Sequence, residues 1–174
     1  MTNSQLSDDL IPALFSQYET LVKWCDDFFK AMAHRHSAAI TCHAGCDSCC
    51  TRETVTALEA EVIIQHIEKT ALDALAPKPG KCIFLSGGRC TVYAARPLIC
   101  RTHGLLLWTK STGQMDRSCN LNYGDENWAS LPAGDGLDHE TITENLVRLN
   151  ALFCQITGTG DENGRVALKD FIAD

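Results

Sequence analysis

Residues 42–50 read CHAGCDSCC and place four cysteines within nine residues. Cys42 and Cys46 are four residues apart and Cys46 and Cys49 three apart, so a helical or turn-like stretch would bring three sulfur atoms to one side. Gly45 would allow the backbone to bend close to a bound ion. Thiolates are soft ligands that select zinc, Cu(I) or iron–sulfur clusters rather than magnesium or calcium. The stretch therefore predicts a metal site.

Eight of the ten cysteines lie between positions 42 and 119, because the motif is followed by Cys82, Cys90, Cys100 and Cys119. A structural zinc ion and a cubane iron–sulfur cluster each take four ligands. Eight thiols therefore fit two centres, or one centre with additional structural cysteines. Adjacent side chains diverge in helices and strands, so we expect Cys49 and Cys50 not to serve the same metal. The alternative for the whole set is buried cysteines, or disulfides in an oxidising compartment.

The overall composition indicates a soluble protein of a reducing compartment. The chain has 174 residues, of which 45% are hydrophobic, enough for one domain with a real core. The polar, acidic start predicts no cleavable signal peptide, and no apolar run approaches the roughly 18 residues of a membrane span. We expect a cytoplasmic protein whose clustered cysteines bind metal ions as partners. The formal charge of -7 argues against nucleic acid and against an anionic membrane; no protein partner is identified.

Three segments have apolar residues at three- and four-residue steps, the pattern of an amphipathic helix. The first runs from about Leu10 to Met32. The second begins at Thr56, where Glu59 three residues later fits a capping box, and ends before Pro77. The third spans His139 to Ile156. Cys25 and Cys154 fall within the apolar stripes of these helices, so we expect both to pack in the core.

Two short hairpins are expected between the helices. One covers residues 82–93 with a turn at Gly87-Gly88, and the other covers residues 104–118 with a turn at Thr112-Gly113. Hairpins of this size are marginal in water, so a metal would contribute directly to their folding. The predicted fold class is mainly α with minor β, with helices framing a cysteine-rich, loop- and hairpin-containing metal-binding centre.

We expect a single domain over residues 1–174 with a metal-binding core at 42–119. The glycine-rich break from Gly158 to Gly164 predicts a loosely attached tail over residues 158–174. The alternative is that the tail docks as a last helix through its apolar residues Val166, Leu168, Phe171 and Ile172.

Arginines close to the cysteines are candidates for balancing the charge of a thiolate centre. A zinc ion or an oxidised cubane with four thiolates keeps net negative charge, which nearby guanidinium groups would offset. We expect this role for Arg96 and Arg101. For Arg52 and Arg89, charge compensation and the role of a solvated surface charge are equally expected.

A tyrosine and two histidines near the cysteines are further candidates for roles at the metal site. Tyr93 is three residues after Cys90, and we expect it to pack over the site with its hydroxyl hydrogen-bonded. His43 and His103 would complete a mixed site only if the surplus cysteines did not. A nucleophilic cysteine activated by arginines ranks below metal binding, because no Cys/His/Asn arrangement singles out one thiol.

Together these residues resemble the YkgJ-type cysteine-cluster family, on the segments Cys42-x3-Cys46-x2-Cys49-Cys50, Cys82-x-Phe84-Leu85 and Arg89-Cys90-x2-Tyr93-x2-Arg96-Pro97-x2-Cys100-Arg101. Its members are described as zinc- or iron-chelating, so the resemblance implies zinc or iron. A related domain occurs in flagellin lysine N-methylases, where the resemblance implies an iron–sulfur cluster working with S-adenosylmethionine. We retain a [4Fe-4S] cluster as an alternative, but not the methylase activity, because no glycine-rich adenosylmethionine loop is recognisable.

Two functions follow from the sequence. The first is a metal-binding protein with a structural, storage or delivery role, favoured by all-cysteine ligation, since catalytic zinc keeps an open position. The alternative is an iron–sulfur redox protein or enzyme related to the cluster domain of flagellin lysine methylases, favoured by the surplus thiols. No sequence motif assigns a catalytic residue, so whether the protein is an enzyme stays open.

Overall fold

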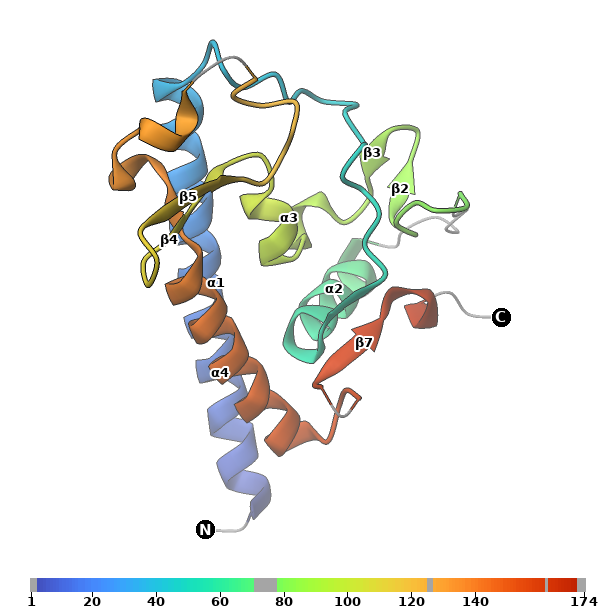
Figure 1. Cartoon of the computed structure of the whole chain (residues 1–174). Helices are drawn as coiled ribbons and strands as arrows, with labels where there is room; N and C mark the ends of the chain where they lie inside the picture. Colours follow the sequence, from blue (N-terminus) through green and yellow to red (C-terminus); the bar gives the residue numbers. More distant parts are fainter. Residues whose placement is uncertain (1–2, 71–77, 125–126, 162, 172–174) are drawn as a thin grey trace. The chain divides into compact units, whose positions relative to one another are not determined.

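A computed structural model describes residues 3–70, 78–124, 127–161 and 163–171 of the chain (Figure 1). Four α-helices lie within these residues: α1 (Asn3–Arg35), α2 (Ala57–Thr70), α3 (Leu98–Thr102) and α4 (His139–Thr157). Within the same ranges the strands are β1 (Thr54–Thr56), β2 (Leu85–Ser86), β3 (Arg89–Cys90), β4 (Leu106–Thr109), β5 (Gln114–Arg117), β6 (Leu137–Asp138) and β7 (Arg165–Ala167). The prediction of a mainly α fold with minor β is confirmed. No helix among the described residues has an apolar stretch long enough to cross a membrane.

The chain divides into two compact units. Unit 1 comprises Met1–Ser7, His43–Pro97 and Leu149–Asp174, and unit 2 comprises Asp8–Cys42 and Leu98–Arg148. The expectation of a single domain over residues 1–174 stays a prediction. The cysteine motif falls at the division between the units, because Cys42 belongs to unit 2 and Cys46 to unit 1.

The long helices form where the sequence predicts them. α2 begins directly after Thr56, whose backbone N–H donates to Glu59 Oε2 at 3.3 Å and whose hydroxyl accepts from the Glu59 backbone N–H at 3.3 Å. This reciprocal pair confirms the predicted capping box. α4 begins at His139 as predicted and ends at Thr157, while α1 is longer at both ends than predicted. The predicted stop of α2 at Pro77 lies outside the described residues.

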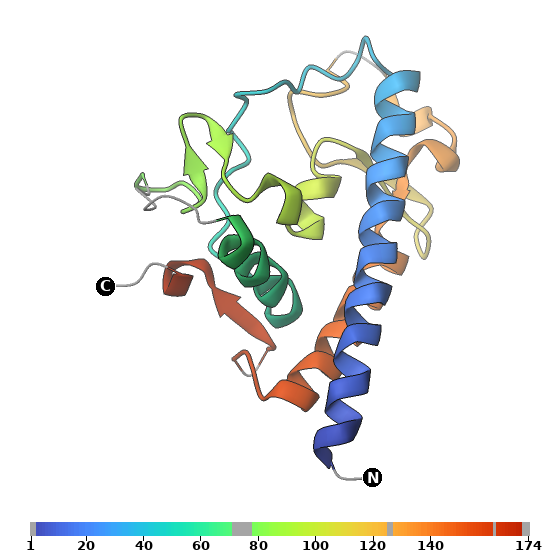
Figure 2. The same cartoon turned by 180° about the vertical axis from the view of Figure 1, so that it is seen from behind.

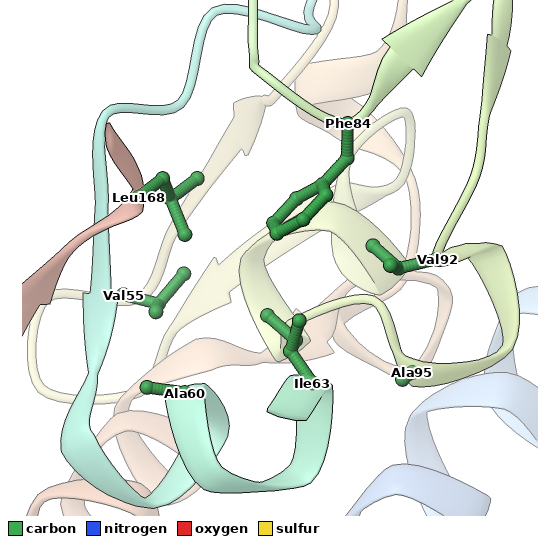
Figure 3. Packing of buried hydrophobic residues seen from close by; sticks show 7 residues of the cluster. All are labelled: Val55, Ala60, Ile63, Phe84, Val92, Ala95 and Leu168. Atoms are coloured by element: carbon green, nitrogen blue, oxygen red, sulfur yellow. The ribbon is translucent and has the colours of Figure 1, made fainter. Parts of the chain in front are cut away.

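The core of unit 1 is a cluster of seven buried apolar residues contributed by β1, α2, the β2–β3 region and the C-terminal segment. Figure 3 shows the Phe84 ring among the side chains of the other members, Val55, Ala60, Ile63, Val92, Ala95 and Leu168. β2 and β3 pair antiparallel, with Leu85 opposite Cys90, which confirms the first predicted hairpin. Cys82 and Cys90 pack against this cluster. The hydrophobic core of unit 1 therefore holds the side chains of two predicted ligand cysteines in place.

The segment expected as a loosely attached tail contributes to this core. β7 pairs antiparallel with β1, with Val166 opposite Val55. Leu168 is 2% exposed, and its N–H donates to the Glu53 carbonyl at 2.7 Å. The Phe171 ring meets the Phe84 ring edge-on at 5.6 Å. The described residues thus dock, as the alternative expected, but as a strand and a 3-10 helix (Leu168–Phe171) rather than an α-helix; Ile172 lies outside the described residues.

Unit 2 contains a three-stranded sheet in the order β5-β4-β6. β4 pairs antiparallel with β5, which confirms the second predicted hairpin. β6 runs parallel to β4, with Leu107 opposite Leu137, a pairing that the sequence did not predict. Gly136 permits the close approach, because a Cβ there would lie only 2.4 Å from the Met115 sulfur.

α1 gives unit 2 a buried apolar stripe, and Figure 2 shows it as one continuous helix. Leu14, Tyr18 and Met32 are at most 5% exposed, and Cys25 is 0% exposed, which confirms its predicted core packing. Leu10 is 47% exposed, so its predicted place on this stripe is wrong. Cys154 on α4 is half-buried.

Candidate metal centre

The eight predicted ligand cysteines divide between the two units. Unit 1 contains Cys46, Cys49, Cys50, Cys82 and Cys90, and unit 2 contains Cys42, Cys100 and Cys119. Thiols are reduced throughout the structure. Unit 1 alone therefore carries more thiols than the four that a zinc ion or a cubane cluster requires.

Two successive tight turns form the part of the motif that lies in unit 1. The Cys46 N–H donates to the His43 carbonyl at 3.0 Å, and the Cys50 N–H donates to the Asp47 carbonyl at 3.0 Å. Gly45 has a φ of +94°, a backbone conformation that favours glycine. The motif is therefore turn-like rather than helical, one of the two forms that the spacing allowed.

The backbone ties these turns to the segment that enters the β2–β3 hairpin. The Cys82 N–H donates to the Cys50 carbonyl at 2.8 Å. The Lys81 ammonium donates to the Asp47 carbonyl at 2.9 Å and lies 3.1 Å from its carboxylate Oδ1. These contacts bring Cys82 to the end of the motif, and the hairpin pairing carries Cys90 alongside.

The unit 1 thiols influence one another electrostatically. Burial is the largest effect on Cys50, Cys82 and Cys90, and it raises the pKa of each. Weaker repulsion from Cys90 and Cys82 raises the pKa of Cys50 further. Repulsion from Cys82 likewise raises the pKa of Cys90. Burial, followed by repulsion from Cys50, raises the pKa of Cys49 to about 11. A bound cation would relieve this repulsion, so the arrangement suits a metal whose binding displaces protons.

The thiols of Cys49 and Cys50 affect each other's acidity: Cys50 raises the pKa of Cys49, and Cys49 lowers that of Cys50 against the larger effect of burial. The Thr51 N–H donates to the Cys49 carbonyl at 2.9 Å, which closes a tight turn at this point. Divergence of adjacent side chains applies to helices and strands, and this turn is neither. That the two thiols do not serve the same metal stays a prediction.

Two arginines of unit 1 act on the thiols. Arg52 lowers the pKa of Cys82, and Arg96 lowers that of Cys90, each against the larger effect of burial. The Arg96 guanidinium also stacks 4.0 Å from the Tyr93 ring centroid, and its Nη1 donates to the Tyr93 carbonyl at 3.0 Å. Tyr93 itself is 62% exposed. The expected place of Tyr93 over a metal stays a prediction, whereas Arg52 lowers the pKa of a thiol just as Arg96 does.

Arg101 has a structural role in unit 2. It is 6% exposed, and its Nη1 lies 2.7 Å from Asp26 Oδ2 on α1. Burial first, and Asp26 second, raise the pKa of the nearby Cys25 to about 12, and Arg101 opposes them. Arg101 therefore fastens α3 to α1, and its expected role beside a metal stays a prediction.

The cysteines of unit 2 lie on three separate segments. Cys42 and Cys100 are exposed and Cys119 is half-buried. The Cys42 N–H donates to the Asn122 side-chain oxygen at 3.2 Å. Of the two histidines considered as ligands, His43 is exposed with its Nδ1 3.0 Å from the Ala44 carbonyl, and His103 is half-buried.

Three polar residues that position the cysteine segments were missed in the sequence. They are Asp47, Lys81 and Asn122. The Lys81 ammonium donates to the carbonyl and carboxylate of Asp47, and the Asn122 side-chain oxygen accepts from the Cys42 N–H, each across a long stretch of chain. No periodicity or spacing marks such contacts, so no local signal could have found them.

Within the described residues, no group of three or more Cys, His, Asp or Glu side chains has the geometry to bind a metal ion. The thiols of unit 1 are thus neighbours that must change rotamer to share one ion. The donor set nevertheless suits zinc or iron, because several soft thiols lie beside compensating guanidinium groups.

Residues 41–120 match the family model CxxCxxCC, which is described as "Putative zinc- or iron-chelating domain". The matched range contains all eight predicted ligand cysteines and excludes Cys25 and Cys154. No curated protein and no solved structure matches the chain significantly. The predicted resemblance to a cysteine-cluster family is confirmed.

Proposed function

Because residues 41–120 match the model of a zinc- or iron-chelating cysteine-cluster family, we propose that the protein binds zinc or iron through the thiolates of its cysteine cluster. The observation that carries the proposal is the grouping of Cys50, Cys82 and Cys90 in unit 1, joined by the Cys82 to Cys50 backbone bond. The bound metal would have a structural role, or the protein would store or deliver the metal.

The ligand set that we propose for unit 1 begins with these three thiols. Each of them lies within electrostatic range of the other two. The fourth ligand would be Cys46, whose thiol raises the pKa of the neighbouring Cys49. Cys49 is adjacent to Cys50, and we expect these two not to serve the same metal. Cys42, Cys100 and Cys119 of unit 2 remain proposed ligands on the strength of the family match that contains them.

Charge supports the same set. Four thiolates around Zn²⁺ leave a net negative charge, which cationic groups nearby stabilise. Arg52 lowers the pKa of Cys82, and Arg96 lowers that of Cys90. We propose that both guanidinium groups offset the charge of the loaded centre.

A [4Fe-4S] cluster is the second candidate, favoured by the number of thiols in unit 1. A cubane needs four cysteines, and five are present there. In that case the protein would serve in electron transfer or in a cluster-dependent reaction. The two candidates share the same thiols and differ in the metal.

Metal analysis of protein purified under anaerobic conditions separates the candidates. Stoichiometric zinc in a colourless protein supports a zinc centre, whereas a brown protein with iron and acid-labile sulfide supports a cluster. Anaerobic handling is required because zinc can replace a cluster lost to oxygen. Purified protein that contains no metal and gains none on addition of zinc or of iron with sulfide would refute the proposal.

A further inference from the structure

Asn122 is a fully buried residue whose side chain joins two distant segments of unit 2. It is 0% exposed. Its Oδ1 accepts hydrogen bonds from the backbone N–H groups of Thr41 at 3.0 Å and Cys42 at 3.2 Å. Its Nδ2 donates to the Gly104 carbonyl at 2.8 Å. One amide thus anchors the peptide that leads into the cysteine motif.

The same network reaches the segments of the other two cysteines of unit 2. Gly104 follows Cys100 by four residues, and its N–H donates to the Ser118 hydroxyl at 2.8 Å. Ser118, directly before Cys119, donates from its hydroxyl to the Leu105 carbonyl at 2.7 Å. Gly104 has a φ of +98°, and a Cβ there would lie 2.9 Å from Asn122 Nδ2, so the contact requires glycine.

We propose that Asn122 is a positioning residue for the Cys42 thiol, an inference that rests on the proposed metal-binding function. Two successive N–H groups directed at one oxygen fix the orientation of the peptide between Thr41 and Cys42. That orientation sets the direction of the Cα–Cβ bond of Cys42, and hence the volume its exposed thiol can reach.

The local structure explains why an anchor is needed. The residues from Ile40 to His43 lie outside any helix or strand. Without the Asn122 amide, the backbone of this segment would have to be ordered when the metal binds, which weakens binding. Partners that orient metal ligands typically change the affinity about 10- to 100-fold when mutated.

Asn150 provides a matched control. It is 6% exposed, its Oδ1 accepts from the Leu58 N–H at 3.0 Å, and its Nδ2 donates to the Gly164 carbonyl at 2.8 Å. It therefore has the same chemistry and a similar burial. It lies outside the range that matches the cysteine-cluster family.

The test is an anaerobic titration of the metal-free full chain with cobalt(II), followed by thiolate-to-cobalt absorption, with Tm measured in parallel. Asn122→Leu should weaken cobalt binding by about 10- to 100-fold. Asn122→Asp keeps the acceptor for both N–H groups and should keep the affinity while lowering Tm. Asn150→Leu should lower Tm and leave the affinity unchanged.

Repeating Asn122→Leu in a Cys42→Ser background separates positioning from general stability. Cys42→Ser alone should weaken cobalt binding, and adding Asn122→Leu should then weaken it no further. The same loss in both backgrounds, or an equal loss in Asn150→Leu, would overturn the inference. If Asn122→Leu does not fold, a weakened affinity of Asn122→Asp overturns it. Wild-type protein that binds neither cobalt, nor zinc, nor iron with sulfide would instead refute the proposed function itself.

Discussion

The backbone N–H of Cys82 donates a 2.8 Å hydrogen bond to the carbonyl oxygen of Cys50. This bond joins the end of the cysteine motif to the segment that enters the β2–β3 hairpin, although the two residues are far apart in the sequence. Since Cys90 lies on the same hairpin, the bond also carries its thiol towards the motif. Thiols of three segments thereby become neighbours within unit 1.

Substitution of the grouped thiols tests their role as ligands. We expect Cys82→Ser and Cys46→Ser each to lower the metal bound per chain and to lower Tm, because metal binding contributes to folding. Elemental analysis and calorimetry would measure the two effects. Cys154→Ser, a half-buried cysteine outside the matched range, should retain the metal. Unchanged metal content in Cys46→Ser would remove Cys46 as the fourth ligand.

Arg96→Gln should weaken metal binding at neutral pH by about 10-fold, the lower end of the range for residues that tune a metal site. Arg96 lowers the pKa of Cys90, so its loss makes that thiol harder to deprotonate. Competition with a chromophoric chelator would measure the change. Arg89→Gln is the control, because Arg89 is an exposed arginine next to Cys90. Equal effects of the two substitutions would argue against a specific role for Arg96.

The metal-free protein should lose stability as the pH rises above 9.0. Burial, and then Asp26, raise the pKa of the Cys25 thiol from 9.0 to about 12. The unfolded chain therefore loses this proton first, and between these pH values the contribution of Cys25 to stability falls by at most about 1.4 kcal/mol per pH unit. Below pH 9.0 the Cys25 thiol is protonated in both the folded and the unfolded chain, so its contribution to stability is fully present. Urea unfolding across this range should show a shallower fall in Cys25→Ala.

Gly164→Ala should destabilise unit 1. Gly164 has a φ of +66°, and a Cβ would lie 2.6 Å from the Asn150 Nδ2 and 3.1 Å from the Cys154 sulfur. The Gly164 carbonyl also accepts from the Ala57 N–H at 2.9 Å, at the start of α2. We expect a loss of about 1–3 kcal/mol, measured by urea unfolding. Gly124→Ala is the control, since nothing lies within 4 Å of a Cβ there.

The sequence predicted the elements whose signals are local. α2 and α4 begin where expected because a capping box and an apolar period mark them, and the two hairpins contain glycine at their turns. The β1–β7 pair and the parallel contact of β6 with β4 were missed. Each involves at least one strand of only two or three residues, and its partner lies far away in the chain. Such short strands have no period of their own.

The sequence predicted which cysteines form the candidate site, but not which residues hold their segments in place. Spacing alone singled out the eight cysteines that the family match contains. Position beside a cysteine suggested Arg101, but this residue is buried against Asp26. Asn122 is an ordinary asparagine in the sequence, and only its three backbone partners reveal its function.

The docking of β7 and Leu168 onto β1 has a consequence for experiments with fragments. The recognisable motif ends at residue 120, yet the core beneath Cys82 and Cys90 includes Leu168, from far beyond it. A gene fragment cut to the motif would expose Val55 and Phe84 to water and would be prone to aggregate. The limits of the recognisable motif are therefore not the limits of a piece that can be transplanted into another protein.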